Sequence, residues 1–301
     1  MRIAFLGPRG THSEEALRAL TPPESEAVPC PSVHDAIVAV SGGAAGRAVV
    51  PIENSLEGSV AATLDALALD ATEVQVVAER TLPIRHRLIA RGDMTLEAIE
   101  RVISHPQALA QCARFVRDRL PHAETAAAAS TADGVRQVAE SAKPWAALGS
   151  RLAAELYGCH VLLDRVEDRD DNVTRFVCLA RADDRAARAP SPGDPAKTSI
   201  VFFGFNDVSP GALVAVLSEL STRGINLTKI ESRPRRVGLG HYMFFADLEG
   251  SVKEPRVAEA LAALRARVET LRVLGSYRAS DAAEGPSGAA ESHRGPLQAP
   301  R

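Results

Sequence analysis

The stretch M-R-I-A-F-L-G-P-R-G-T-H-S-E-E-A-L-R-A-L (residues 1–20) decides the fold class. The apolar residues 3–6 predict a buried strand, and the glycines of G-P-R-G permit a tight turn after it. The segment that follows predicts a helix through Leu20, and Thr11 with Glu14 matches the spacing of a capping box at its start. A strand that passes directly into a helix is the unit of an α/β domain.

The same alternation continues through the first part of the chain, which predicts a largely parallel sheet. Ligands bind such sheets beyond the carboxyl ends of the strands, where the loops lie. Gly158 predicts the end of one helix, because glycine tolerates the left-handed conformation found there. Further strands are predicted at 47–50, 74–79, 86–90, 101–104 and 146–148, with two late strands H-V-L-L and T-R-F-V-C-L-A, and further helices at 59–69 and 106–120.

The second part of the chain has a different rhythm. Residues 182–197 have three prolines and no apolar period, which predicts a linker. Residues 198–278 read β-α-β-β-α-β, a ferredoxin-like order, with Ser209 as the predicted N-cap of the first helix. Residues 279–301 are rich in Gly, Pro, Ser, Ala and charge, which predicts a disordered tail.

Composition excludes several classes of protein. The chain has 301 residues, 46% of them hydrophobic, and a net charge of −3, which argues against nucleic acid as a partner. Its four cysteines lack C-x-x-C spacing and no His stands at zinc-ligand spacing, so no metal site is predicted. The N-terminal apolar run is too short for a signal peptide, and no run approaches membrane-spanning length. We therefore expect a cytoplasmic protein without membrane contact.

Polar side chains gather where three predicted strands pass into helices. The loops are G-P-R-G-T-H-S, P-I-E-N-S-L-E-G-S and S-H-P-Q-A-L. A helix starting at the first loop would direct free N–H groups toward an anion, although each loop could equally be a capped turn. The candidate residues in these loops are Thr11, Ser13, Asn54, Ser55, Ser59, His105 and Gln107.

A fourth polar stretch is D-D-N-V-T-R-F (170–176). The hydroxyl of Thr174 could donate to a departing oxygen as charge develops there, but periodicity alone favours a structural strand residue. Arg175 points to the opposite face of a regular strand. It could bind a carboxylate, or it could pair with Asp170 or Asp171. No nucleotide, metal or nucleophile-elbow motif appears, so we expect a reaction without nucleotide, metal or covalent intermediate.

Taken together, these segments resemble the prephenate dehydratase family. G-P-R-G-T-H-S-E-E-A, P-I-E-N-S-L-E-G-S-V, S-H-P-Q-A-L-A-Q-C and N-V-T-R-F occur in the family's order at about its spacing. The second part resembles the ACT regulatory domain, through P-G-A-L-V (210–214), G-I-N-L-T-K-I-E-S-R-P (224–234) and V-L-G-S-Y (273–277). One departure is His12, where the family often has Phe.

The resemblance implies a fold. The catalytic domain (1–181) is expected to have two α/β lobes with a cleft between them, like type II periplasmic binding proteins. Lobe 1 would comprise about 1–79 and 165–181, and lobe 2 about 80–164. The linker and an ACT domain (198–278) would follow, in a homodimer or homotetramer.

The resemblance also implies a reaction, the conversion of prephenate to phenylpyruvate with loss of carbon dioxide and water. Aromatisation drives this reaction, so no cofactor is required. Thr174 would be the catalytic threonine and Phe176 would pack behind it. Arg175 and the loop residues named above would bind the substrate.

Phenylalanine is the effector that the resemblance implies, bound where two segments meet at a dimer interface. The substrate could also be arogenate, and a non-catalytic amino-acid-binding regulator is the alternative from another class. The implied effector residues are Gly211, Ala212, Leu213, Val214, Asn226, Leu227, Glu231, Ser232, Arg233 and Pro234.

Overall fold

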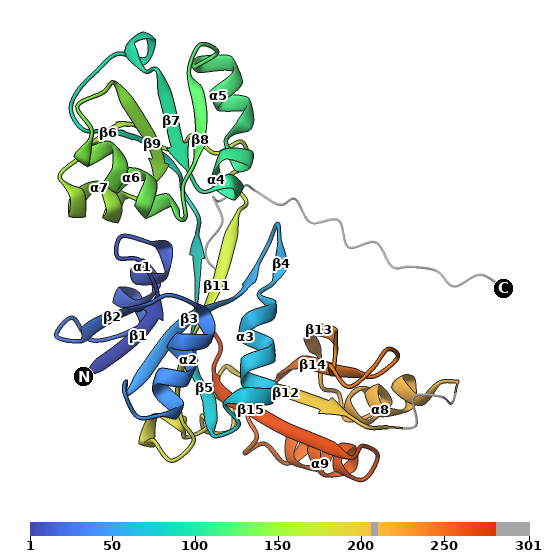
Figure 1. Cartoon of the computed structure of the whole chain (residues 1–301). Coiled ribbons are helices and arrows are strands. Elements are labelled where there is room, and N and C mark those ends of the chain that lie inside the picture. Colours follow the sequence, from blue (N-terminus) through green and yellow to red (C-terminus); the bar gives the residue numbers. More distant parts are fainter. Residues whose placement is uncertain (206–209, 281–301) are drawn as a thin grey trace.

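Three β-sheets, each flanked by helices, organise the computed structural model (Figure 1). The structure describes residues 1–205 and 210–280. We call the part built on the first sheet the first lobe (2–83 and 173–181), the part on the second sheet the second lobe (87–163), and the part on the third sheet the C-terminal domain (196–278). The two-lobed α/β prediction and the ferredoxin-like prediction are confirmed.

The sheet of the first lobe has the order β2-β1-β3-β11-β5, with β4 paired to β3. β1 is parallel to β2 and β3, whereas β11 is antiparallel to both β3 and β5. β1, β2, β3 and β5 therefore run in one direction, as the predicted largely parallel sheet requires, and β11 and the short β4 run against them. β11 is reversed because the chain leaves this lobe along β5 and returns along β11. The strands are β1 (Arg2–Leu6), β2 (Glu26–Cys30), β3 (Arg47–Asn54), β4 (Gly58–Ser59), β5 (Val74–Pro83) and β11 (Val173–Arg181).

Three helices accompany this sheet, and three of the lobe's elements were not predicted, one of them the two-residue β4. β2 and α2 are missing from the sequence prediction, and β2 is an edge strand with no fully buried residue. The predicted helix 59–69 is instead a short α-helix that continues as a π-helical turn, Ala66–Asp70. The helices are α1 (His12–Leu20), α2 (Val33–Ser41) and α3 (Ala61–Asp65).

The second lobe has a mixed sheet in the order β10-β6-β9-β7-β8. The predicted helix 106–120 breaks at Cys112 into α4 and α5, while Gly158 is the left-handed C-cap that was predicted. The hydroxyl of Ser150 donates to the Gly10 carbonyl oxygen (2.6 Å), which joins the two lobes. The elements are β6 (Arg87–Ala90), β7 (Arg101–Ser104), α4 (Pro106–Gln111), α5 (Ala113–Arg119), β8 (Glu124–Ala127), α6 (Thr131–Glu140), β9 (Trp145–Gly149), α7 (Arg151–Tyr157) and β10 (His160–Leu163), with a 3-10 turn at Leu96–Ala98.

The C-terminal domain has an antiparallel sheet in the order β13-β14-β12-β15. α8 begins at Ala212 after a left-handed Gly211, later than predicted, and Ser209 lies outside the described residues. The elements are β12 (Ala196–Phe203), α8 (Ala212–Ser221), β13 (Leu227–Pro234), β14 (Tyr242–Glu249), α9 (Pro255–Arg265) and β15 (Thr270–Arg278).

The C-terminal domain shares a hydrophobic core with the first lobe. One face of its sheet packs under α8 and α9. The other face contributes Phe245, Leu274 and Tyr277 to a cluster that contains Ile52 and Val76 of the first lobe. This face is therefore buried within one chain, and Figure 1 shows the domain beside β5 and α3.

The segments that join and follow these parts are described in part. The predicted linker contains a 3-10 turn, Arg185–Ala187, and β12 begins at its end. Of the predicted tail, Ala279 and Ser280 are described and Ala279 donates to the Pro195 carbonyl oxygen (3.1 Å), whereas 281–301 lie outside the described residues. Within the described residues, no helix is both long and apolar enough to cross a membrane.

Candidate functional site

A cavity of about 350 Å³ lies between the two lobes. Loops after β1, β3 and β7 form its walls together with the start of β11, which is where polar loops were predicted to meet. Its described lining residues include no Lys, Arg, Asp or Glu. Seven predicted site residues line it: Thr11, Ser13, Asn54, His105, Gln107, Thr174 and Phe176.

Thr174 and Asn54 form the centre of the site. They are directly opposite each other on β11 and β3, and the Asn54 amide donates to Thr174 Oγ1 (2.8 Å). The Asn54 side chain is itself fixed, because its oxygen Oδ1 accepts from the backbone N–H groups of Leu56 (2.9 Å) and Glu57 (3.0 Å). The Thr174 hydroxyl makes no other hydrogen bond within the described residues, so its proton is free to donate into the cavity.

A chain of neutral hydrogen bonds leads away from this pair. Asn54 also donates to Asn172 Oδ1 (2.8 Å), and Asn172 donates to Gln111 Oε1 (3.1 Å). The same oxygen lies 2.9 Å from His86 Nε2, which therefore carries the proton. Burial lowers the pKa of His86, although its bond to Gln111 opposes this effect. The imidazole is therefore neutral, and its Nδ1 has no partner in the described residues.

His12 lies next to His86 in the cavity wall. The two rings are 6.0 Å apart in an edge-to-face arrangement. His12 Nδ1 pairs with the Glu15 carboxylate (2.8 Å), and its Nε2 is buried without a partner in the part of the chain that the structure describes. The residue that departs from the family pattern thus adds a polar group where a phenylalanine would add none.

Three helices begin at the cavity. Their N-caps are Thr11 (α1), His105 (α4) and Ser130 (α6), and helix N-termini favour negative charge. The predicted capping box does not form. The Thr11 hydroxyl donates to the carbonyl oxygens of Leu6 (3.3 Å) and Pro8 (3.1 Å), and the Glu14 carboxylate accepts from Gly10 N–H (2.7 Å). The site is therefore an uncharged cavity with converging helix ends, suited to an anion.

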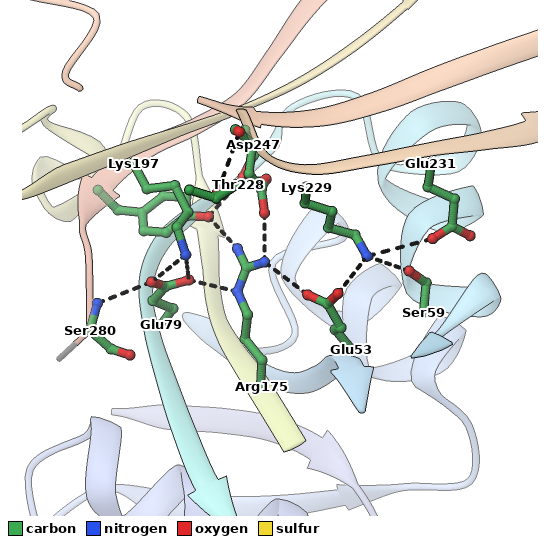
Figure 2. Close-up of polar contacts among 12 residues, drawn as sticks. Glu53, Ser59, Glu79, Arg175, Lys197, Thr228, Lys229, Glu231, Asp247 and Ser280 are labelled. Carbon is green, nitrogen blue, oxygen red and sulfur yellow. Dashed lines mark hydrogen bonds and ion pairs between the residues drawn. The ribbon is translucent and has the colours of Figure 1, made fainter. Parts of the chain in front are cut away.

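Arg175 lies outside the cavity, on the opposite face of β11, as the alternation of a regular strand predicts (Figure 2). Its guanidinium donates to Glu79 (2.6 Å), Asp247 (2.6 Å) and Tyr277 (2.8 Å). The placement contradicts both predicted roles, substrate binding and a pair with Asp170 or Asp171. Those partners were not predicted because two of them come from the C-terminal domain.

Two other predicted residues also lie outside the cavity. Ser59 contacts Lys229 Nζ (Figure 2). The Ser55 hydroxyl donates to the Asp171 carbonyl oxygen (3.1 Å) and accepts from Val173 N–H (3.0 Å). Ser55 therefore ties the loop after β3 to β11 and contributes no group to the cavity.

The sequence prediction missed several polar residues of the cavity. Asn172 and Gln111 stand inside N-V-T-R-F and S-H-P-Q-A-L-A-Q-C, so their position in those motifs was the available signal. His86 precedes a strand without any such motif. The missed polar residues are His12, His86, Gln111, Ser130, Thr131 and Asn172.

A second cavity, of about 390 Å³, lies in the C-terminal domain. Four predicted effector residues line it, together with Phe205, Gly240, Tyr242 and Phe244. The four are Gly211, Ala212, Leu213 and Val214. The other predicted effector residues do not line it within this chain. They are Asn226, Leu227, Glu231, Ser232, Arg233 and Pro234. Of these, Asn226 donates to Glu249 (3.0 Å), and Arg233 pairs with Asp65 (2.6 and 2.9 Å).

Comparison with known proteins matches both parts of the chain. The family model for prephenate dehydratase matches residues 3–184, and that for the ACT domain matches 199–266. A prephenate dehydratase of Amycolatopsis methanolica is 42% identical over 280 residues, which cover 93% of this chain and 89% of the relative.

Two solved structures are similar over nearly the whole chain. A prephenate dehydratase of Arthrobacter aurescens in complex with L-Phe has a TM-score of 0.84 and 38% identity, covering 95% of this chain and 94% of that one. A protein described as GqqA, a novel type of quorum quenching acylase, has a TM-score of 0.82 and 33% identity, covering 93% and 98%.

Proposed function

Because the chain belongs to the prephenate dehydratase family, we propose that it converts prephenate to phenylpyruvate with loss of carbon dioxide and water. The observation that carries this proposal is the Thr174 hydroxyl, held by Asn54 in an uncharged cavity between the two lobes. A substrate with two carboxylates and a departing hydroxyl fits a site made of helix N-termini and neutral donors.

The substrate would be held without a salt bridge. Its carboxylates would lie at the N-termini of α1 and α6, with hydrogen bonds from the backbone N–H of Thr11 and from Ser13, His105 and Gln107. An uncharged cavity between the two lobes would limit the water around the carboxylate that is lost, which favours its conversion to carbon dioxide because charge disperses on the way.

Thr174 would assist departure of the hydroxyl group. The electron pair of the breaking carbon–carboxylate bond enters the ring as the carbon–oxygen bond breaks, and Thr174 donates a hydrogen bond to the departing hydroxide. The hydroxide takes up a proton from solvent and leaves as water. Thr174 Oγ1 accepts a hydrogen bond from the Asn54 amide, so the threonine proton points away from Asn54. A donor aimed at developing charge is worth about 3 kcal/mol.

Phenylalanine would bind the C-terminal domain and regulate turnover. The similar Arthrobacter aurescens structure is a complex with L-Phe, and the second cavity contains four predicted effector residues. The segment 231–234 would come from another copy of the chain, in a homodimer or homotetramer. We place the protein in the cytoplasm, with no nucleic acid or membrane partner.

Acyl hydrolysis is less well supported, despite the similarity to a protein described as an acylase. A hydroxyl nucleophile needs a hydrogen-bonded base. Among the described cavity residues, His12 pairs with Glu15, His86 with Gln111 and His105 with the Gln107 backbone, and none of them bonds a Ser or Thr hydroxyl.

The test is turnover of two substrates by the purified full chain. Phenylpyruvate from prephenate is followed by absorbance in alkali, and phenylalanine from arogenate by chromatography. We expect kcat/KM for prephenate to exceed that for arogenate by about tenfold or more. Turnover of neither substrate, with phenylalanine still bound, would instead identify an amino-acid-binding regulator.

A further inference from the structure

The backbone of β11 carries two functions on consecutive residues. Thr174 is opposite Asn54 on the cavity face, and Arg175 is opposite Glu53 on the other face. Both residues are 8% exposed. Because β11 pairs with β3 on one side and β5 on the other, a shift of Arg175 displaces the backbone that holds Thr174.

The C-terminal domain holds Arg175 through two residues. Asp247 on β14 and Tyr277 on β15 accept from its Nη1 (2.6 Å) and Nη2 (2.8 Å), while Glu79 of the first lobe accepts from Nε (2.6 Å). Glu53 lies 3.3 Å from Nη1. Figure 2 shows this guanidinium between carboxylates of both domains.

A second set of bonds fixes these partners. The Ser199 hydroxyl donates to Asp247 (2.5 Å) and lies 2.7 Å from the Tyr277 hydroxyl. Lys197 and Lys229, both of the C-terminal domain, donate to Glu79 (2.9 Å) and Glu53 (3.0 Å). The side chains of Arg175, Glu79 and Asp247 are only 10%, 2% and 7% exposed, so these charges are shielded from water and tolerate little rearrangement.

β14, the strand whose Asp247 binds Arg175, also lines the second cavity. Tyr242 and Phe244 of β14 line that cavity, and Asp247 follows on the same strand, on the face turned toward the first lobe. A ligand that moves β14 therefore moves Asp247. Packed elements of this kind transmit small displacements because they have few alternative arrangements.

We propose that Arg175 is a positioning residue through which the C-terminal domain sets the orientation of Thr174, with Asp247 as the link from the second cavity. This rests on the proposed function, since it assigns a regulatory route to that site. Phenylalanine in the second cavity changes the position of β14, and the Asp247–Arg175 bond passes the change to β11.

The test compares Asp247→Asn with Glu219→Gln. Both replace a carboxylate of the C-terminal domain by an amide, but Glu219 pairs with Arg223 and Arg267 of its own domain. In Asp247→Asn, we expect the fold change in kcat caused by phenylalanine to shrink about five- to tenfold, with KM for prephenate little changed. Glu219→Gln should respond as the wild type does.

A second readout is independent of turnover. Hydrogen–deuterium exchange of β11 should change when phenylalanine is added to the wild type and to Glu219→Gln. In Asp247→Asn, phenylalanine should still change exchange at 211–214 but leave β11 unaltered. A β11 response in Asp247→Asn equal to that of the wild type, or none in the wild type, would overturn the proposal. Failure of the wild type to convert prephenate would be seen separately and would reject the proposed function.

Discussion

Thr174 and Arg175 are consecutive residues of β11, and their side chains are buried on opposite faces of the same sheet. The threonine accepts a hydrogen bond from Asn54 in the cavity between the lobes. The arginine donates to Asp247 of the C-terminal domain. The pleat of one strand therefore separates the proposed chemistry from the proposed regulation by a single peptide unit.

Asn54→Asp should lower kcat/KM by about a hundredfold or more. The variant keeps the shape of the side chain, but it loses the amide donor to Thr174 and places a negative charge beside a dianionic substrate. Steady-state kinetics with prephenate measures the effect. Ser55→Ala is the matched control, since Ser55 is the next residue and lies outside the cavity; a loss as large in Ser55→Ala would show that loop disorder causes both.

His86 should make the protein less stable in mild acid. Burial lowers the pKa of His86, so the folded protein holds it neutral while the unfolded chain takes up a proton below about pH 6.5. The free energy of unfolding should therefore decrease as the pH falls through that value. His86→Gln removes the titrating group, so urea unfolding at pH 8 and pH 5.5 should show a smaller decrease for the variant. An equal decrease in both proteins would exclude His86 as the cause.

Asp65→Asn should destabilise the contact between the C-terminal domain and α3. Asp65 is a buried partner of Arg233 (2.6 and 2.9 Å) and Arg236 (2.6 Å), and its pKa is lowered chiefly by the bond from Arg233. Loss of these charge-assisted bonds should cost about 1.5–3 kcal/mol at neutral pH. The stabilisation is present above the unfolded pKa of about 3.8 and is lost as the pH falls through the folded value.

Asp70→Asn is the control for that prediction, because the pair of Asp70 with His34 is half exposed (3.4 Å). Its free energy of unfolding should change by less than about 1 kcal/mol. Arg233 was also a predicted effector residue. If Asp65→Asn changed phenylalanine affinity strongly while leaving unfolding unaffected, Arg233 would belong to the effector site and not to the domain contact.

Gly275→Ala should separate the C-terminal domain from the first lobe. A Cβ atom at this position would lie 2.2 Å from the Val76 carbonyl oxygen, and neither backbone can move without disturbing its sheet. We expect a loss of about 1–3 kcal/mol or more in thermal or urea unfolding. Gly92→Ala, where a Cβ atom meets nothing within 4 Å, should be tolerated. A stable Gly275→Ala protein would mean that β15 and β5 are less closely packed than described.

The sequence predicted those structural features that depend on a few neighbouring residues. The left-handed Gly158 and the strand alternation that turns Arg175 away from Thr174 depend on a few neighbouring residues, and both are observed. Seven cavity residues were predicted, five of them because they follow the ends of predicted strands, whereas six polar ones were missed. The edge strand β2 was missed because it has no fully buried residue to give it a period.

Long-range partners could not be predicted in this way. Arg175 was assigned to the substrate because Asp247 and Tyr277, which bind it, are 72 and 102 residues further along the chain. The capping box of Thr11 and Glu14 was wrong for a different, local reason, since Glu14 is bonded to the nearby Gly10, Arg9 and Arg18. In both cases, the residue type correctly predicted that the side chain makes polar contacts, but the sequence did not show which residue it contacts.

The most direct measurement is the turnover number for prephenate of Thr174→Val, compared with Thr174→Ser and the wild type. Valine keeps the branched shape of threonine and replaces the hydroxyl by a methyl group, and the Asn54 amide keeps Asn172 as an acceptor, so folding should be preserved. We predict a kcat lowered by about a hundredfold or more in Thr174→Val, and by clearly less in Thr174→Ser. A folded Thr174→Val protein that retains turnover within a few-fold of the wild type would contradict the role of the Thr174 hydroxyl.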